Sequence, residues 1–203
     1  MQIGSKIALT VVIAIIAATA GWQVGRLAAP GAPQLQSGTW LPAARATLPF
    51  ALLDQQGRAA REQLLHGRAT LLFFGFSNCP DLCPTTLALL AGVRKSTKLK
   101  PLQVVMVSID PERDTPLQLQ RYLSGFDPSF IGLTGEAARI EALTREFSGV
   151  ALRQPLPGGD YTMDHSATVY LLDHAGRLVA VFTPPLSLEK MRQDLDALQG
   201  RLG

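Results

Sequence analysis

A strand pattern that runs into a cysteine-containing loop and then into a helix pattern limits the folds open to this chain more than any other feature. The apolar run at residues 71–76 is typical of a buried strand, and polar residues and two prolines end it. Pro84 suits the first position of a helix, and apolar residues at helical spacing then predict a helix over residues 84–95. Both cysteines of the chain, Cys79 and Cys83, therefore lie at a strand–loop–helix corner.

The spacing of the two cysteines favours chemistry over scaffolding. A disulfide between Cys79 and Cys83 would close so short a loop that it would restrict the unfolded chain little. The positive end of the helix dipole near Cys83 favours its thiolate, which is the form that attacks disulfides and binds soft metals. Redox exchange and metal binding are therefore both open to this pair.

From residue 48 onward, strand and helix patterns alternate. Strands are predicted at residues 48–53, 70–76, 102–109, 130–133, 168–172 and 178–182, and helices at 84–95, 116–123, 135–147 and 187–202. A β-α-β crossover that carries two cysteines at its first helix, followed by a hairpin and a helix, is typical of a thioredoxin-like fold. We therefore expect an α/β domain with a central mixed sheet flanked by helices.

An uncharged apolar segment precedes this domain. Residues 7–24 contain no charged side chain and would span about 27 Å as a helix, close to the hydrocarbon thickness of a membrane. We expect residues 1–27 to be an N-terminal membrane anchor, with a cleaved signal peptide as the alternative. Residues 28–47, rich in Ala, Pro, Gly and Gln, are predicted to be a flexible tether, and residues 48–203 the folded domain. Lys6 and the terminal amine favour an exported domain, which would meet disulfide-forming conditions.

The charge pattern argues against a nucleic-acid partner. The net charge is only +3 over 203 residues, and the sequence has no basic stripe with interleaved aromatic residues. The expected partners are therefore proteins and, through the N-terminal helix, a membrane.

One histidine stands where a thioredoxin-like fold would bring it near the thiols. Thioredoxins have two residues between their cysteines and a cis-proline that faces them, just before a strand of the hairpin. This chain has three residues between its cysteines, and His165 lies just before the strand at 168–172 with no proline adjacent. Two thiolates and an imidazole form a soft donor set that suits copper, because thiolates select Cu(I) and imidazole also binds Cu(II). A closed zinc site would need a fourth protein ligand, which the sequence does not offer at a useful spacing.

Three longer motifs follow one another along the domain. They are Cys-Pro-Asp-Leu-Cys-Pro at 79–84, Asp-Pro-Glu-Arg-Asp-Thr-Pro at 110–116, and Asp160-Tyr161 followed by Asp164-His165-Ser166. Together they resemble the motifs of the Sco/SenC family of copper-binding assembly proteins. The similarity covers the domain from about residue 48 to the C-terminus and includes the N-terminal anchor.

The resemblance implies a metal site, a task and a location. It implies that Cys79, Cys83 and His165 are copper ligands and that the two cysteines also form a redox-active pair. The implied task is delivery of copper to the dinuclear site of cytochrome c oxidase subunit II, maintenance of the thiols of that subunit, or both. The implied location is the inner membrane, with the C-terminal domain facing the periplasm. The implied partners besides subunit II are a thioredoxin-like reductant and another copper donor protein.

Three function classes stay open, and they differ in the residues they need. A copper metallochaperone needs both cysteines and His165, whereas a membrane-anchored thiol–disulfide oxidoreductase needs the cysteine pair alone. A peroxidase, the least favoured class, needs an arginine at the reactive cysteine, and none can be placed there from the sequence. Because copper binds only the dithiol form, a reductant must act before loading in the first class. Enzymatic activity is thus undecided at the level of the sequence.

Ordinary roles are expected for the other notable residues of these motifs. Asp110 and Asp114 are expected to form the turn and cap the following helix, with a role near the site as the alternative. Asp164 orients His165 or belongs to a turn. The side chain of Met163 is expected to point away from His165.

Overall fold

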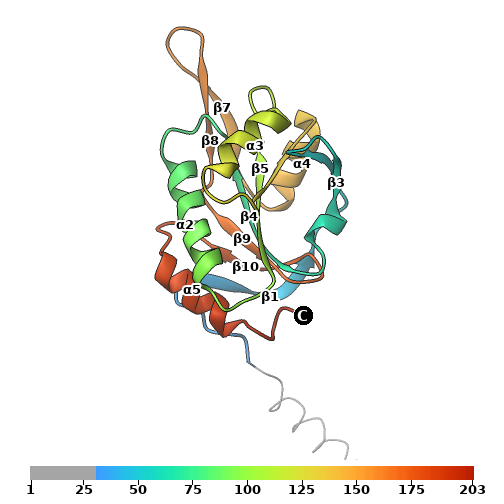
Figure 1. The fold of residues 1–203 in the computed structure, drawn as a ribbon, viewed down its shortest axis with the longest axis vertical. Helices are drawn as coiled ribbons and strands as arrows, with labels where there is room; N and C mark the ends of the chain where they lie inside the picture. The colour runs from blue at the N-terminus through green and yellow to red at the C-terminus, as the bar shows by residue number, and fades with distance from the viewer. Residues whose placement is uncertain (1–30) are drawn as a thin grey trace, which may run out of the picture. The chain divides into compact units, whose positions relative to one another are not determined.

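A mixed eight-stranded sheet lies at the centre of the computed structural model, which describes residues 31–203 (Figure 1). The strands are β1 (Gly38–Ala46), β2 (Ala51–Asp54), β3 (Ala59–Arg61), β4 (Ala69–Gly75), β5 (Leu102–Ser108), β6 (Ile131–Thr134), β7 (Ala151–Pro155), β8 (Tyr161–His165), β9 (Val169–Leu172) and β10 (Arg177–Phe182). The helices are η1 (Glu62–Leu65), α2 (Leu82–Ser96), α3 (Pro116–Ser124), α4 (Ala137–Glu146) and α5 (Leu188–Ala197).

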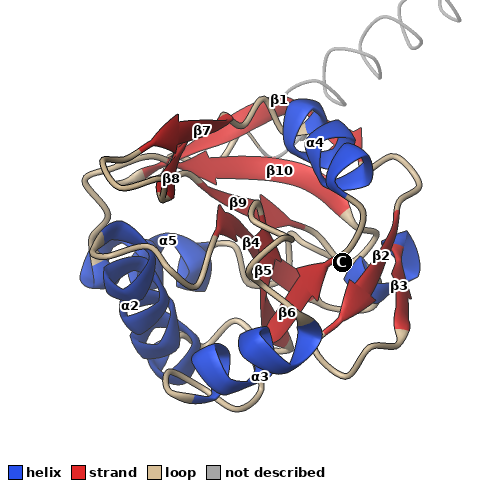
Figure 2. Ribbon diagram, turned by 90° about the horizontal axis from the view of Figure 1, so that it is seen from above, coloured by secondary structure: helices blue, strands red, loops and turns tan. Residues whose placement is uncertain are grey.

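The layers of the domain match the predicted architecture. The strand order of the large sheet is β1-β10-β9-β4-β5-β6-β2-β3, and β7 and β8 form a separate two-stranded sheet. Helices α2, α3 and α5 cover one face of the large sheet, and α4 lies on the other (Figure 2). The expectation of an α/β fold with a central mixed sheet flanked by helices is confirmed.

Strands β4 and β5 form the buried centre of the sheet and run parallel. All seven residues of each strand are buried, because helices cover the sheet on both faces, and such strands are continuous apolar runs. Their carboxyl ends lie side by side, with Gly75 paired to Ser108. The loop after β4 carries Cys79 and leads into α2, whose first turn contains Cys83, and the loop after β5 carries residues 110–114. These two loops therefore meet at one edge of the sheet.

The side chains of successive residues of β4 point to opposite faces of the sheet. Phe74 packs against the rings of Phe147 and Tyr170, with centroid distances of 5.7 and 5.8 Å, on the face covered by α4. Phe73 points to the other face, where its ring contacts the imidazole of His165 at a centroid distance of 5.8 Å. One strand thus supplies both a core contact and a wall of the candidate site.

The domain begins earlier in the chain than the sequence predicted. Residues 38–46 belong to the predicted flexible tether 28–47, yet they form the edge strand β1 and pair with β10. No alternating apolar pattern marks this strand, because most of its side chains are exposed. The buried carboxylate of Asp194 on α5 accepts hydrogen bonds from the backbone N–H groups of residues 36–38, which fixes the start of the strand.

The β7–β8 hairpin was also missed, and it projects beyond the large sheet (Figure 1). Its strands pair antiparallel, with Ala151 opposite His165. Four of the five side chains of β7 are exposed, so the sequence carries no core-facing pattern there and predicts neither strand of this hairpin. Because His165 ends β8, this hairpin decides where the imidazole lies.

The expected anchor, residues 1–27, lies outside the described residues. Residues 31–37 contain neither a helix nor a strand. Between residues 31 and 203, no helix combines the length and the apolar character needed to cross a membrane.

Candidate metal centre

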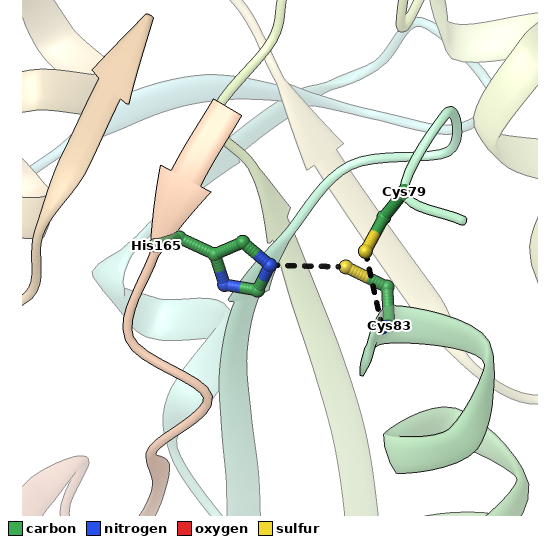
Figure 3. Close-up of side chains that lie close together, drawn as sticks. All are labelled: Cys79, Cys83 and His165. Atoms are coloured by element: carbon green, nitrogen blue, oxygen red, sulfur yellow. Dashed lines mark hydrogen bonds between the residues drawn. The ribbon is translucent and has the colours of Figure 1, made fainter. Parts of the chain in front are cut away.

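Three side chains from separate parts of the chain converge beside the carboxyl end of β4 (Figure 3). Cys79 lies in the loop after β4, Cys83 in the first turn of α2, and His165 at the end of β8. Their sulfur and ring nitrogen atoms all lie within 4.8 Å of one another. Cys83 Sγ is 3.3 Å from Nε2 of His165, a contact between residues 82 apart in the chain. Folding therefore brings together the three residues that the sequence singled out.

The two thiols lie in different surroundings. Helix α2 begins at Leu82 rather than at Pro84, and the backbone N–H of Cys83 donates a hydrogen bond to Cys79 Sγ at 3.3 Å. The helix N-terminus therefore faces the sulfur of Cys79. Cys83 is fully buried, and burial raises the pKa of its thiol. The expectation of a favoured Cys83 thiolate is wrong for the metal-free protein, because desolvation outweighs the hydrogen bond with the backbone of Phe76 that lowers the pKa. A metal must therefore displace the proton of this thiol in order to bind.

The imidazole of His165 is held with one nitrogen available to a metal. Nδ1 lies 3.2 Å from the carbonyl oxygen of Ser166, which can only accept, so Nδ1 carries the proton of the neutral ring. Nε2, which faces Cys83, then has the lone pair that a metal ligand needs. Phe73 and Phe76 make edge-on contacts with the ring at centroid distances of 5.8 Å. Burial lowers the pKa of His165, so the neutral, metal-binding form is favoured near pH 7.

Gly75 leaves room for the sulfur of Cys83. A Cβ atom at this position would lie 3.0 Å from Cys83 Sγ and 2.6 Å from a ring carbon of Phe73, inside a fully buried strand. We expect Gly75→Ala to displace the sulfur, to weaken metal binding, and to lower the free energy of unfolding by about 1–3 kcal/mol, as overpacked cores do. A metal titration and urea unfolding measure the two effects.

Gly31→Ala is the matched control for that experiment. Nothing lies within 4 Å of a Cβ atom built at Gly31, so the same chemical change is expected to alter neither measurement. Wild-type values for Gly75→Ala in both assays would show that the strand can move aside and that the close approach at Gly75 is not required.

The donor atoms lie beside a pocket of about 290 Å³. Its walls include Phe76, Cys79, Leu82, Met163 and His165, and Leu82 is 52% exposed at the rim. The expectation that Met163 points away from His165 is wrong, because strand residues two apart share a face of the strand. The thioether of Met163 is therefore a further soft group in the wall of this pocket.

Asp114 holds the cysteine loop in place, which differs from the helix cap expected for it. Helix α3 is capped by Thr115, whose hydroxyl accepts a hydrogen bond from the N–H of Gln118 at 3.2 Å. Asp114 is fully buried, and its carboxylate accepts hydrogen bonds from the N–H of Ser77 at 3.0 Å, from the hydroxyl of Ser77, and from the hydroxyl of Ser108 at 2.5 Å. Since Ser77 begins the loop that carries the cysteines, the motif at 110–116 supports the motif at 79–84.

The fold and the site together define a class of protein: a thioredoxin-like domain in which a histidine completes a cysteine pair into a soft donor set. The family model for SCO1/SenC matches residues 40–200 of this chain. The chain belongs to the SCO1/SenC family, and the resemblance seen in its sequence is confirmed.

Individual relatives agree with this assignment. A protein of Stutzerimonas stutzeri named for copper binding is 37% identical over 76% of this chain and 78% of its own length. The copper-bound structure of ScoI from Bradyrhizobium japonicum has a TM-score of 0.69 and 39% identity, and it covers 78% of this chain and 99% of its own. BsSco, described as a member of the Sco family of cytochrome c oxidase assembly proteins, has a TM-score of 0.63 over 80% of this chain and 98% of its own. At 23% identity, BsSco shows the shared fold alone.

Proposed function

We propose that this protein binds copper on Cys79, Cys83 and His165 and delivers it during assembly of cytochrome c oxidase. The observation that carries the proposal is the approach of two sulfurs and one imidazole nitrogen to within 4.8 Å of one another. Thiolates select Cu(I) over harder ions, and an imidazole extends the donor set to Cu(II). The copper-bound relative from Bradyrhizobium and the Stutzerimonas relative support the same choice of metal.

The uneven burial of the site suits transfer of the metal. Cys83 is fully buried, whereas Cys79 is half-buried and lines the open pocket. An acceptor thiolate can therefore approach copper from the side of Cys79 and replace one donor at a time. Since the donors are soft and Cu(I) tolerates two or three ligands, each intermediate of such an exchange keeps an acceptable donor set.

Anaerobic copper titration of the reduced protein tests the proposal. We expect one copper per chain, and we expect His165→Ala to weaken binding and to change the optical and electron-spin-resonance spectra of the Cu(II) form, because it removes the nitrogen donor. His66→Ala, which alters an exposed histidine outside the cluster, is the matched control and should leave both unchanged. A His165→Ala variant with the wild-type stoichiometry and spectrum would contradict the ligand assignment.

A second candidate function is thiol–disulfide exchange that keeps oxidase cysteines reduced. The observation that favours it is the pairing of a half-buried thiol with a buried one four residues later, an arrangement in which Cys79 can attack and Cys83 can resolve. This activity requires both cysteines and does not require His165. Rapid reduction of a peptide disulfide that is equally fast in His165→Ala would favour the exchange role over the copper role.

The finer parts of the assignment follow from the family resemblance. The proposed acceptor is the dinuclear copper site of oxidase subunit II, and the proposed further partners are a thioredoxin-like reductant and a second copper donor. Residues 1–27 are proposed to anchor the protein in the inner membrane, with the domain in the periplasm. The apolar segment at residues 7–24 and the soft donor set support this placement, since a reductant and an oxidase subunit would then meet the domain on one side of the membrane.

A further inference from the structure

The hairpin that carries His165 needs contacts from outside itself. Strands β7 and β8 pair with each other and not with the large sheet, as far as residues 31–203 show. A lone two-stranded hairpin is only marginally stable in water. Side-chain contacts must therefore fix the hairpin, and with it the position of Nε2 of His165. Tyr161, Met163 and His165 share one face of β8, and Tyr161 makes the contacts that reach the loop after β5.

The ring of Tyr161 is held between two guanidinium groups. The Cζ atom of Arg113 lies 3.7 Å from the ring centroid, and that of Arg153 lies 3.6 Å from it. Two groups this close to one centroid must occupy opposite faces of the ring. Guanidinium groups stack well on aromatic faces, so the ring is restrained from both sides. The hydroxyl of Tyr161 also donates a hydrogen bond to Oδ1 of Asp110 at 2.8 Å.

The two arginines differ in what they join. Arg113 donates from Nε to Oδ2 of the buried Asp110 at 2.5 Å and from a terminal nitrogen to the carbonyl oxygen of Tyr161 at 3.0 Å. Arg153 belongs to the hairpin itself, is 52% exposed, and pairs with the exposed Glu112 at 2.9 Å. Surface pairs of that kind contribute little. Of the two, Arg113 connects the hairpin backbone to a buried charge of the loop after β5.

The same loop holds the other half of the site. Asp114, the residue after Arg113, binds the backbone and hydroxyl of Ser77, where the cysteine loop begins. Residues 110–114 therefore contact the histidine hairpin through Arg113 and the cysteine loop through Asp114. A shift of the hairpin relative to this loop is a shift of His165 relative to both sulfurs.

We infer that Arg113 is a positioning residue for His165: its contacts with Asp110 and Tyr161 set the 3.3 Å separation between Nε2 and Cys83 Sγ. The inference rests on the proposed copper function. When the contacts of Arg113 with Asp110 and Tyr161 loosen, the imidazole moves away while both thiols stay in place. A site with three donors then becomes a site with two thiols. The affinity for Cu(II) depends on these contacts more than the affinity for Cu(I) does, because two thiolates alone satisfy Cu(I).

The matched pair Arg113→Lys and Arg153→Lys tests the inference in the full-length protein. Both changes keep a positive charge beside Tyr161, but a lysine at position 113 lacks the planar fork that binds Asp110 and the Tyr161 carbonyl together. We expect Arg113→Lys to lower the affinity for Cu(II) by roughly 10–100-fold, the range found for residues that orient metal ligands. The affinity for Cu(I) should fall less, and the nitrogen hyperfine coupling of the Cu(II) form should weaken. Arg153→Lys removes one stacking contact on the Tyr161 ring but leaves the hydrogen bonds of Arg113 to Asp110 and to the Tyr161 carbonyl in place, so it should change all three quantities much less than Arg113→Lys does.

A second variant guards against a general loss of stability. Arg113→Lys weakens the ion pair of the buried Asp110 carboxylate. Tyr161→Leu instead removes the ring between the two guanidinium groups and leaves the Arg113–Asp110 pair intact. Tyr161→Leu is expected to give the same selective loss of Cu(II) affinity and of nitrogen coupling. Unfolding free energies of the metal-free variants are measured alongside.

The outcomes separate the inference from the proposed function. A wild-type protein that binds no copper would refute the function itself. A wild-type protein with the expected site, together with Arg113→Lys and Tyr161→Leu variants that keep its Cu(II) affinity and nitrogen coupling, would refute the inference alone. Equal losses of Cu(I) and Cu(II) binding that track the loss of folding stability would also refute it, since Arg113 would then act only on the fold.

Discussion

Cys83→Ser is expected to abolish stoichiometric copper binding while the domain stays folded. Serine nearly preserves the volume of the buried side chain, but its hydroxyl stays protonated near pH 7 and is a hard donor that Cu(I) disfavours. The loss should exceed the roughly 10–100-fold effect of altering a residue that only orients a ligand. Anaerobic competition with a Cu(I) chelator measures the affinity, and urea unfolding measures the fold.

A control on the same helix separates ligand loss from a disturbed helix. Thr86 is 5% exposed and lies one turn after Cys83 on α2, so Thr86→Ser makes a small buried change on the same element. It is expected to leave copper binding unchanged. Tight one-to-one binding of Cu(I) by Cys83→Ser would remove this cysteine from the ligand set and with it the proposed site.

The central part of the fold was predictable because burial leaves a mark on the sequence. Strands β4 and β5 are covered on both faces, so each is a continuous apolar run that no surface loop would show. Edge strand β1 and the β7–β8 hairpin carry mostly exposed side chains, and their pairing depends on partners that a local pattern cannot reveal. The missed elements are therefore the exposed ones, including the one that positions His165.

The site was predictable only as far as its donor atoms. The cysteines stand out by their spacing, and His165 by its place before a strand of the predicted hairpin. The residues that hold these donors stayed hidden, because their roles depend on which loops meet at the edge of the sheet. Asp114 and Ser77 are 37 residues apart in the chain, and Arg113 and Tyr161 are 48 apart. The motif at 110–116 marked the right segment, but a local pattern favours turn and cap roles for Asp114 and cannot show that it binds the distant Ser77.

Asp114→Ala is expected to have the largest effect on stability, because it removes the acceptor of three hydrogen bonds at once. The N–H and hydroxyl of Ser77 and the hydroxyl of Ser108 would lose this partner inside the protein. The full cost of an unsatisfied buried group, about 1–3 kcal/mol, applies to the hydroxyl of the buried Ser108, and the half-buried Ser77 adds less. We therefore expect a loss of about 2–4 kcal/mol, a large part of the roughly 5–15 kcal/mol that a domain has. Urea unfolding measures it, and copper affinity should fall as well because the cysteine loop is released.

Asp114→Asn distinguishes the hydrogen bonds of this residue from its charge. Burial raises the pKa of Asp114 above its ordinary value of 3.8, so the folded state binds a proton more readily than the unfolded state. Binding of this proton stabilises the folded state fully at pH values below the pKa of Asp114 in the unfolded chain. The stabilisation is lost as the pH rises through the pKa of Asp114 in the folded protein. Asparagine is neutral at every pH and keeps an acceptor for the N–H of Ser77, so its stability relative to wild type should improve as the pH rises through that window. An Asp114→Asn variant as unstable as Asp114→Ala at neutral pH would show that the negative charge itself holds the cysteine loop.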